Sequence, residues 1–334
     1  MLKNMDEQEL WTDVSDVIVS QCATSEKYLD YVLENKGKKK FVLDYDDNIF
    51  DISPYNPAYK DHGTKSVYVV MDNDEKVSLW EHGRDGFDIL KNQEKMEIFK
   101  ETIRAVDLIT TPSPILSGMF KMRGAKNVKV IKNFIDFETW FPINLVKDDY
   151  IRIGYQGGWS HYEDFIEIKE AISKIMDKHK NVLLVIMGQH YDGSLKGIDK
   201  DRIIIEKWMS VESYPWKFKS LNIDIGIAPL YTNSFSNCKS EIKWEEYGSL
   251  EIPCVASNIP PYNLNIDHNK TGLLASNQDE WVEYLELLID DKETRGLIGK
   301  NARKEIEENY SLDKEIVQYK NAYESLFKRN LVLV

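Results

Sequence analysis

Two successive series of short apolar strands, each alternating with amphipathic helices, constrain the fold of this 334-residue chain most strongly. Runs such as Val182-Leu-Leu-Val-Ile-Met187 are apolar throughout, which is typical of strands buried on both faces. Strands that alternate with helices indicate parallel pairing, with helices covering the faces of the sheet. The predicted strands are 16–20, 40–44, a hairpin at 66–70 and 76–80, 107–110 and 128–131, followed by 150–154, 182–187, 202–205, 223–228 and 253–256.

The alternation breaks at Asn133-Phe-Ile-Asp-Phe-Glu-Thr-Trp-Phe-Pro142 and then restarts, so we place a domain boundary at about 142–149. The chain length suits two average domains. Open α/β sheets bind ligands at the carboxyl ends of their strands. The sequence therefore predicts an α/β protein with two Rossmann-like domains that face each other across a cleft, and a last helix at about 312–328.

The net charge argues against a protein that binds DNA non-specifically, and the cysteine content argues against a disulfide framework or a metal knuckle. The chain has 43 basic and 56 acidic residues and a net charge of −13, so a polyanion would meet net repulsion. Its three cysteines, Cys22, Cys238 and Cys254, lie far apart and form no metal-binding or disulfide pattern, which is typical of a reducing compartment. No apolar run is long enough to span a membrane, and the first residues lack a signal-peptide pattern. We therefore expect a cytoplasmic protein.

One basic run, Lys36-Gly-Lys-Lys-Lys40, has two interpretations. It is either a solvated loop or a patch that binds phosphate or nucleic acid.

A glycine-rich loop, Gly154-Tyr-Gln-Gly-Gly-Trp-Ser-His161, follows a predicted strand and precedes a predicted helix over 164–178. Glycines let the backbone approach a bound group, and the helix N-terminus offers free N–H groups suited to a diphosphate. The glycine spacing matches neither the dinucleotide fingerprint nor the P-loop, which excludes a P-loop ATPase. The sequence also lacks the zinc-binding HExxH pattern and the serine-hydrolase GxSxG pattern.

A polar segment after the strand at 223–228 contains the next candidates. We expect a helix to begin near Lys239 and Ser240, with Ser240 as its cap. Lys239, Lys243 and Glu246 would then share one helix face. That face is either solvated and laced with salt bridges, or it binds a ligand, because burying such charges is costly unless they are paired.

The stretch Glu246-Tyr-Gly-Ser-Leu-Glu-Ile-Pro-Cys-Val-Ala-Ser257 resembles the donor-binding region of the retaining glycosyltransferases of family four, which have the GT-B fold. That region carries an E-x7-E motif. The resemblance places Glu246 on the second glutamate, which holds the ribose hydroxyls of the nucleotide, and Cys238 on the first. It implies that Asn237, Lys239 and Ser240 substitute for the missing glutamate, with Lys239 facing the phosphates.

Further stretches resemble the same family. His268-Asn-Lys-Thr-Gly-Leu-Leu274 is similar to a turn of its donor domain, and the segment from Ser311 is similar to the helix that crosses back to its first domain. The resemblance implies an acceptor-side domain over 1–145, a donor domain over 146–310 and a crossing helix over 311–330. Family members usually begin with additional βα units, so the N-terminal domain is expected to be reduced.

The resemblance also assigns residues of the glycine-rich loop and a tryptophan to the donor. Gly157, Gly158, Ser160 and His161 would contact the nucleotide sugar. Trp208 lies where the family has a loop that contacts the nucleobase, although a tryptophan buried in the core is the alternative.

The aspartates of Asp44-Tyr-Asp46-Asp47 have three interpretations. In the resemblance, Asp46 replaces a histidine near the transferred sugar and acts as an active-site carboxylate. The same spacing has the form of a DxD metal motif, since carboxylate oxygens suit Mg²⁺ or Mn²⁺. The aspartates could also organise the following loop through Asx turns.

Taken together, the resemblance implies a retaining, metal-independent glycosyltransferase that moves a hexosyl or pentosyl group from a nucleotide-diphospho-sugar without a cofactor. Fixed cations must then offset the charge that grows on the leaving diphosphate, and we assign catalysis to Asp46, Lys239 and Lys243. The acceptor is a glycan, a protein or a modified DNA base. Nucleic acid is therefore expected as a partner only in the role of acceptor. Whether the chain forms an oligomer is left open.

The competing class is a non-catalytic protein that binds a sugar nucleotide or a glycan, or a subunit that completes a partner's acceptor site. Cys238 in place of the first motif glutamate and the reduced first domain both favour it.

Overall fold

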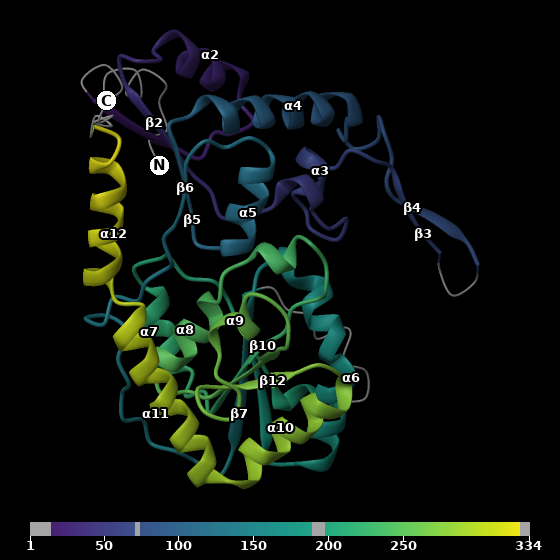
Figure 1. Cartoon of the computed structure of the whole chain (residues 1–334). Helices are drawn as coiled ribbons and strands as arrows, with labels where there is room; N and C mark the ends of the chain where they lie inside the picture. Colours follow the sequence, from purple (N-terminus) through teal and green to yellow (C-terminus); the bar gives the residue numbers. More distant parts are fainter. Residues whose placement is uncertain (1–14, 71–73, 189–197, 328–334) are drawn as a thin grey trace. The chain divides into compact units, whose positions relative to one another are not determined.

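The computed structural model describes residues 15–70, 74–188 and 198–327. The chain forms two compact units. Unit 1 takes residues up to 54, 58–132 and those from 316 onward, and unit 2 takes 55–57 and 133–315. Each unit is built around its own parallel sheet with helices packed against it (Figure 1). The predicted α/β class is therefore confirmed.

Unit 1 contains a four-stranded parallel sheet in the order β1-β2-β5-β6. Its central strands are apolar, and Val42, Leu108 and Ile131 pack together with Ala322 of the last helix. The elements of this unit are β1 (Val17–Ser20), α2 (Glu26–Glu34), β2 (Lys40–Asp44), α3 (Tyr59–His62), α4 (Ile89–Ala105), β5 (Leu108–Thr111), α5 (Pro114–Met122), β6 (Val128–Val130) and most of α12 (Leu312–Glu324).

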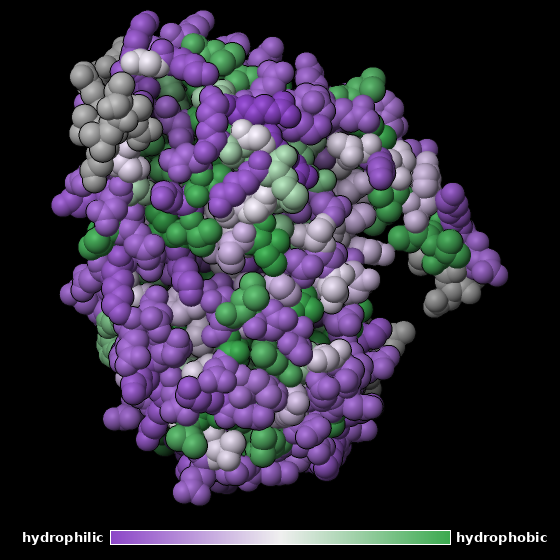
Figure 2. All heavy atoms as spheres, in the orientation of Figure 1, coloured by the Kyte–Doolittle hydropathy of each residue, from purple (hydrophilic) through white to green (hydrophobic). Residues whose placement is uncertain are grey.

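The predicted hairpin is confirmed as the antiparallel pair β3 (Val67–Val70) and β4 (Lys76–Trp80). It exposes apolar side chains, with Tyr68 at 43% and Val70 at 68% exposure. Figure 2 shows apolar groups on the hairpin, whereas hydrophilic residues predominate on the rest of the visible face. Among the helices of the described ranges, none is long and apolar enough to cross a membrane.

Unit 2 contains a six-stranded parallel sheet in the order β12-β11-β10-β7-β8-β9. Strand β8 is buried on both faces, because Leu184 and Ile186 pack into one core and Val185 and Met187 into another. The elements of this unit are β7 (Ile151–Gly157), α6 (Tyr162–Lys178), β8 (Val182–Gly188), β9 (Ile203–Glu206), α7 (Tyr214–Ser220), β10 (Ile225–Ala228), α8 (Ile242–Ser249), β11 (Cys254–Ser257), α9 (Tyr262–Asn265), β12 (Leu273–Ala275), α10 (Gln278–Asp290) and α11 (Lys292–Asn309).

The interruption in the sequence pattern contributes to the core of unit 2. Ile135 and Trp140 are buried there, and the Ile135 N–H donates to the Tyr310 carbonyl at 2.8 Å. The division between the units falls between Lys132 and Asn133, earlier than the boundary placed at 142–149. The sequence does not show that this segment belongs to the core, because its apolar residues follow neither strand nor helix periodicity.

Helix α8 packs closely on the sheet because a strand glycine, Gly226, makes room for it. The ring of Tyr247 lies over Gly226 of β10, where a Cβ would sit 2.4 Å from the ring. The Tyr247 hydroxyl donates to the Gly154 carbonyl of β7 at 2.7 Å. On the other side of α8, a Cβ on Gly248 would meet Ile306 of α11 at 2.4 Å. The helix is therefore fixed between the sheet and α11.

We expect Gly226→Ala to destabilise the protein by about 1–3 kcal/mol, because the added methyl group overpacks the site under Tyr247. Chemical denaturation measures the change. The matched control is Gly296→Ala in α11, where the added Cβ meets open space and should stabilise the helix by roughly 0.5–1 kcal/mol. A Gly226→Ala protein as stable as the wild type would contradict the close approach of α8.

Candidate functional site

The candidate residues of unit 2 gather where β7 and β8 end. Gly157 and Gly188 are register partners at the carboxyl ends of these strands. Gly188 has φ +110, and a Cβ there would lie 2.6 Å from the Gly157 carbonyl oxygen and 2.5 Å from Nε1 of Trp208. Trp208 therefore lies against this edge of the sheet. It is 47% exposed, so the alternative of a core tryptophan is wrong.

The predicted loop over 154–161 is only partly a loop, because residues 154–157 belong to β7 and only 158–161 connect this strand to α6. Apart from its chain neighbours, no described residue would have an atom within 4 Å of a Cβ on Gly158, so this position leaves room for an approaching group. Ser160 is exposed. His161 takes the N-cap position of α6, but its side chain makes no capping hydrogen bond and is engaged elsewhere.

His161 links α6 to α8 through a chain of polar contacts. Its Nδ1 lies 2.7 Å from Asp164 Oδ2, and Asp164 Oδ1 accepts the Tyr231 N–H at 2.8 Å. Its Nε2 lies 3.4 Å from the Lys243 ammonium. Burial, and next the Lys243 charge, lower the pKa of His161 to about 4. The neutral ring thus donates from Nδ1 to Asp164 and accepts from Lys243 at Nε2.

Lys243 and Glu246 lie one turn apart on α8. Lys243 is 8% exposed, and burial lowers its pKa to about 8. Burial raises the pKa of Glu246 to about 7. The interpretation of these two residues as part of a solvated face is therefore wrong, because desolvation disfavours the charge on both.

Glu246 is engaged by two residues that the sequence argument missed. Gln156 Nε2 donates to Glu246 Oε2 at 2.5 Å, and the Tyr214 hydroxyl lies 2.9 Å from the same oxygen. Gln156 lies in β7, within the glycine-rich stretch 154–161, and could have been named with it. Tyr214 carries no such signal, because it lies on α7 and is far from both partners in the sequence.

The start of α8 differs from the prediction. The helix begins at Ile242, two residues after Ser240, and Glu241 takes the N-cap position. Ser240 does not cap the helix, because its hydroxyl accepts the Asn133 side-chain amide at 2.7 Å. Lys239 therefore lies in the loop before the helix and does not share the face of Lys243 and Glu246.

The loop before α8 holds the remaining candidates. The Lys239 ammonium lies 4.4 Å from the centroid of the Phe235 ring, and its charge contributes to lowering the pKa values of His161 and Lys243. Cys238 is 3% exposed. The side-chain oxygen of Asn237 is buried and has no hydrogen-bond partner among the described residues.

Asp46 belongs to unit 1, where it follows β2 and is exposed. The preceding Asp44 is engaged, since the Thr110 hydroxyl donates to its Oδ1 at 2.5 Å. Within the part of the chain that the structure describes, no group of three or more His, Cys, Asp or Glu side chains could hold a metal ion.

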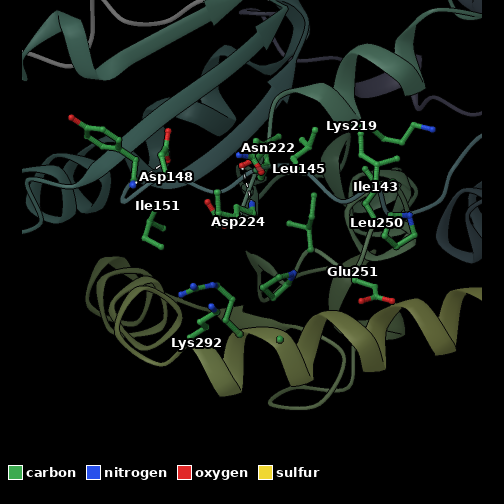
Figure 3. A pocket seen from close by; sticks show the side chains of 18 residues that line it. Ile143, Leu145, Asp148, Ile151, Lys219, Asn222, Asp224, Leu250, Glu251 and Lys292 are labelled. Carbon is green, nitrogen blue, oxygen red and sulfur yellow. Dashed lines mark hydrogen bonds and ion pairs between the residues drawn. The ribbon is translucent and has the colours of Figure 1, made fainter.

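A cavity of about 460 Å³ lies at the opposite edge of the unit 2 sheet (Figure 3). Ile151, Asp224 and Pro253, which line it, stand at or just before the amino ends of β7, β10 and β11. Lys292 of α11 closes another side. None of the predicted site residues lines this cavity, so it is separate from the edge that holds Lys243 and Glu246.

Among the comparisons with known proteins, the family match lies within unit 2. Residues 136–305, slightly more than half of the chain, match the family described as glycosyl transferases group 1. The capsular polysaccharide biosynthesis glycosyltransferase CapM of Staphylococcus aureus is 25% identical over 50% of this chain and 44% of its own length. Glycosyltransferase 1 domain-containing protein 1 of Xenopus tropicalis is 28% identical over 47% of this chain and 46% of its own. The chain thus spans less than half the length of these curated relatives.

Solved structures share the fold. HepE of Anabaena, in complex with UDP, aligns with 96% of this chain and 81% of its own at a TM-score of 0.65 and 12% identity. Sucrose-phosphate synthase of Thermosynechococcus elongatus aligns with 96% of this chain and 77% of its own, at a TM-score of 0.64 and 13% identity. The expected GT-B fold is confirmed, whereas family four and retention stay predictions. By the match over 136–305, the chain belongs to the glycosyl transferases group 1 family.

Proposed function

We propose that this chain transfers a sugar from a nucleotide-diphospho-sugar to an acceptor. The observation that carries the proposal is the buried contact between Lys243 of α8 and His161 of the glycine-rich loop, with Glu246 one turn further along the same helix. A cation, an open backbone loop and a carboxyl group thereby meet at one edge of a parallel sheet, where such sheets bind ligands. The complexes of HepE with UDP and with UDP-glucose make uridine nucleotides the first probes to use.

Charge on the leaving diphosphate sets the chemical requirement. Lys243 keeps most of its charge at neutral pH, and its burial strengthens any attraction to an anion. Lys239 contributes a second cation nearby, and the backbone at Gly157, which ends β7, and at Gly158 can come close to the phosphates. In this proposal, fixed cations and backbone dipoles offset the charge, so transfer needs no metal and no cofactor.

The other candidates divide between nucleotide and sugar. Glu246 is proposed to bind the ribose hydroxyls, and Trp208, half-exposed at the edge of the sheet, to contact the base. Asp46 of unit 1 is proposed to contact the transferred hexosyl or pentosyl group, with retention of its anomeric configuration. The acceptor is a glycan, a protein or a modified DNA base.

One observation favours a second function, a non-catalytic protein that binds sugar nucleotides. A buried cysteine, Cys238, occupies the position that the E-x7-E comparison assigns to a carboxylate. Hydrolysis of UDP-, GDP- and ADP-sugars separates the two functions. The transferase should release sugar from one of them, whereas binding without any release would favour the second function.

We expect Lys243→Met and Lys239→Ala each to lower the rate of donor hydrolysis by roughly 10²–10³-fold, because each removes a cation from the leaving diphosphate. Release of sugar from the donor that the wild type hydrolyses in this screen measures the rate, and circular dichroism confirms folding. The control is Lys174→Met, an exposed lysine of α6 outside the site. Full activity of both site variants would remove the proposed phosphate role.

The affinity for UDP-glucose should fall as the pH rises above about 8, because the lysine that binds the diphosphate is then deprotonated. The expected loss is about tenfold per pH unit, since binding requires the protonated fraction of Lys243. Titration calorimetry between pH 6.5 and roughly 9.5 measures it. Lys243→Arg should abolish this pH dependence, because arginine stays protonated throughout. An equal fall in both proteins would show that another group causes it.

A further inference from the structure

We propose that Tyr214 and Gln156 are positioning residues that hold the Glu246 carboxyl group in place and keep its Oε1 available to the ribose of a bound nucleotide. This inference rests on the proposed function, because it concerns the same site. It assigns a role to two residues that do not belong to the E-x7-E motif.

Both hydrogen bonds of the Glu246 carboxyl group reach the same oxygen. Gln156 Nε2 donates to Oε2 at 2.5 Å, and the Tyr214 hydroxyl lies 2.9 Å from Oε2 and 2.9 Å from Gln156 Oε1. Across the described residues, no hydrogen bond reaches Oε1 of Glu246. That oxygen is also not among the buried polar atoms that lack a partner, so solvent or a ligand can reach it.

The position of the Tyr214 hydroxyl is fixed by its aromatic surroundings. Its ring centroid lies 5.5 Å from that of Trp140 and 5.7 Å from those of Phe218 and Trp208. Three contacts on one ring leave the hydroxyl little freedom. Phenylalanine can occupy the same space, so Tyr214→Phe removes the hydroxyl while keeping the packing.

The two hydrogen bonds at Oε2 favour the ionised form of Glu246, whereas the burial of this residue disfavours it. Burial raises the pKa of Glu246 to about 7, and the hydrogen bonds from Tyr214 and Gln156, together with the Lys243 charge, act against that rise. An ionised carboxylate that is held at Oε2 presents Oε1 as an acceptor in one direction. A ribose hydroxyl, which is a donor, fits that requirement.

The test compares ribose with deoxyribose. Calorimetry measures the affinities of the wild type for UDP, GDP and ADP and for their 2′-deoxy counterparts. The readout, for the diphosphate that binds, is the ratio of the affinity for the ribonucleotide to the affinity for the deoxyribonucleotide. We expect the wild type to prefer the ribonucleotide about tenfold, as for one hydrogen bond to a charged group. Tyr214→Phe should bring the ratio close to one by weakening ribonucleotide binding alone, and Gln156→Leu should do the same.

Two controls separate positioning from stability. Tyr310→Phe removes a buried hydroxyl of the same core, which donates to the Asn265 side-chain oxygen at 3.1 Å, and should keep the wild-type ratio. Glu246→Ala should lose the preference, and adding Tyr214→Phe to it should change the ratio no further.

The outcomes distinguish this inference from the proposed function. If the wild type prefers ribonucleotides and Tyr214→Phe retains the ratio or weakens both ligands equally, the inference is overturned and the proposed function stands. Should Tyr214→Phe fail to fold, Gln156→Leu decides by the same ratio. A wild type that binds a diphosphate without preference overturns the ribose contact and the inference, and one that binds no diphosphate overturns the proposed function as well.

Discussion

The close approach of α8 to the sheet of unit 2 is the contact on which the candidate site depends. Tyr247 lies over Gly226, where any side chain would displace it, and its hydroxyl reaches the Gly154 carbonyl at 2.7 Å. Because the helix is fixed at this depth, Lys243 meets His161 and Glu246 meets Gln156. A helix held further away would leave both side chains in solvent, and their pKa values would stay near their ordinary range.

This depth gives the site its electrostatic character. Lys243, Glu246 and His161 are ionisable, and burial is the largest cause of the shift in each pKa. His161 is neutral at pH 7 and accepts from Lys243, while Asp164 holds the opposite side of the ring. The pKa of Lys243 therefore lies close to neutral pH, and an anionic ligand would stabilise the charged form of this lysine. Binding of a diphosphate would therefore raise the pKa of Lys243, which links affinity to pH.

Much of the architecture could be predicted from the sequence, because strands buried on both faces leave unmistakable apolar runs. The run at 182–187 became β8, and the hairpin at 66–80 formed as predicted. The strand β12 (Leu273–Ala275) was missed, because three residues are too few to show a period and its sequence had been interpreted as a turn. Its pairing with β11 depends on the surrounding sheet, which local sequence does not specify.

The candidate site was predictable only in part. Glu246 and His161 belong to recognisable segments, but the helix was expected to start at Ser240, since serine is a good cap. A partner distant in the sequence, Asn133, engages that serine instead. Tyr214 likewise reaches Glu246 through tertiary packing alone. The start of α8 and the partners of Glu246 depend on contacts between segments far apart in the chain. The local sequence around each residue does not indicate these contacts.

Amide hydrogen exchange with and without a saturating nucleoside diphosphate (UDP, GDP or ADP) tests the central claim most directly, because it locates the ligand without assuming an activity. The account predicts slower exchange in the segments 157–161 and 239–247, at the edge of the sheet beside α8. Protection confined to 142–151 and 292–296, which border the cavity at the opposite edge, would contradict it, as would unchanged exchange throughout with all three nucleotides.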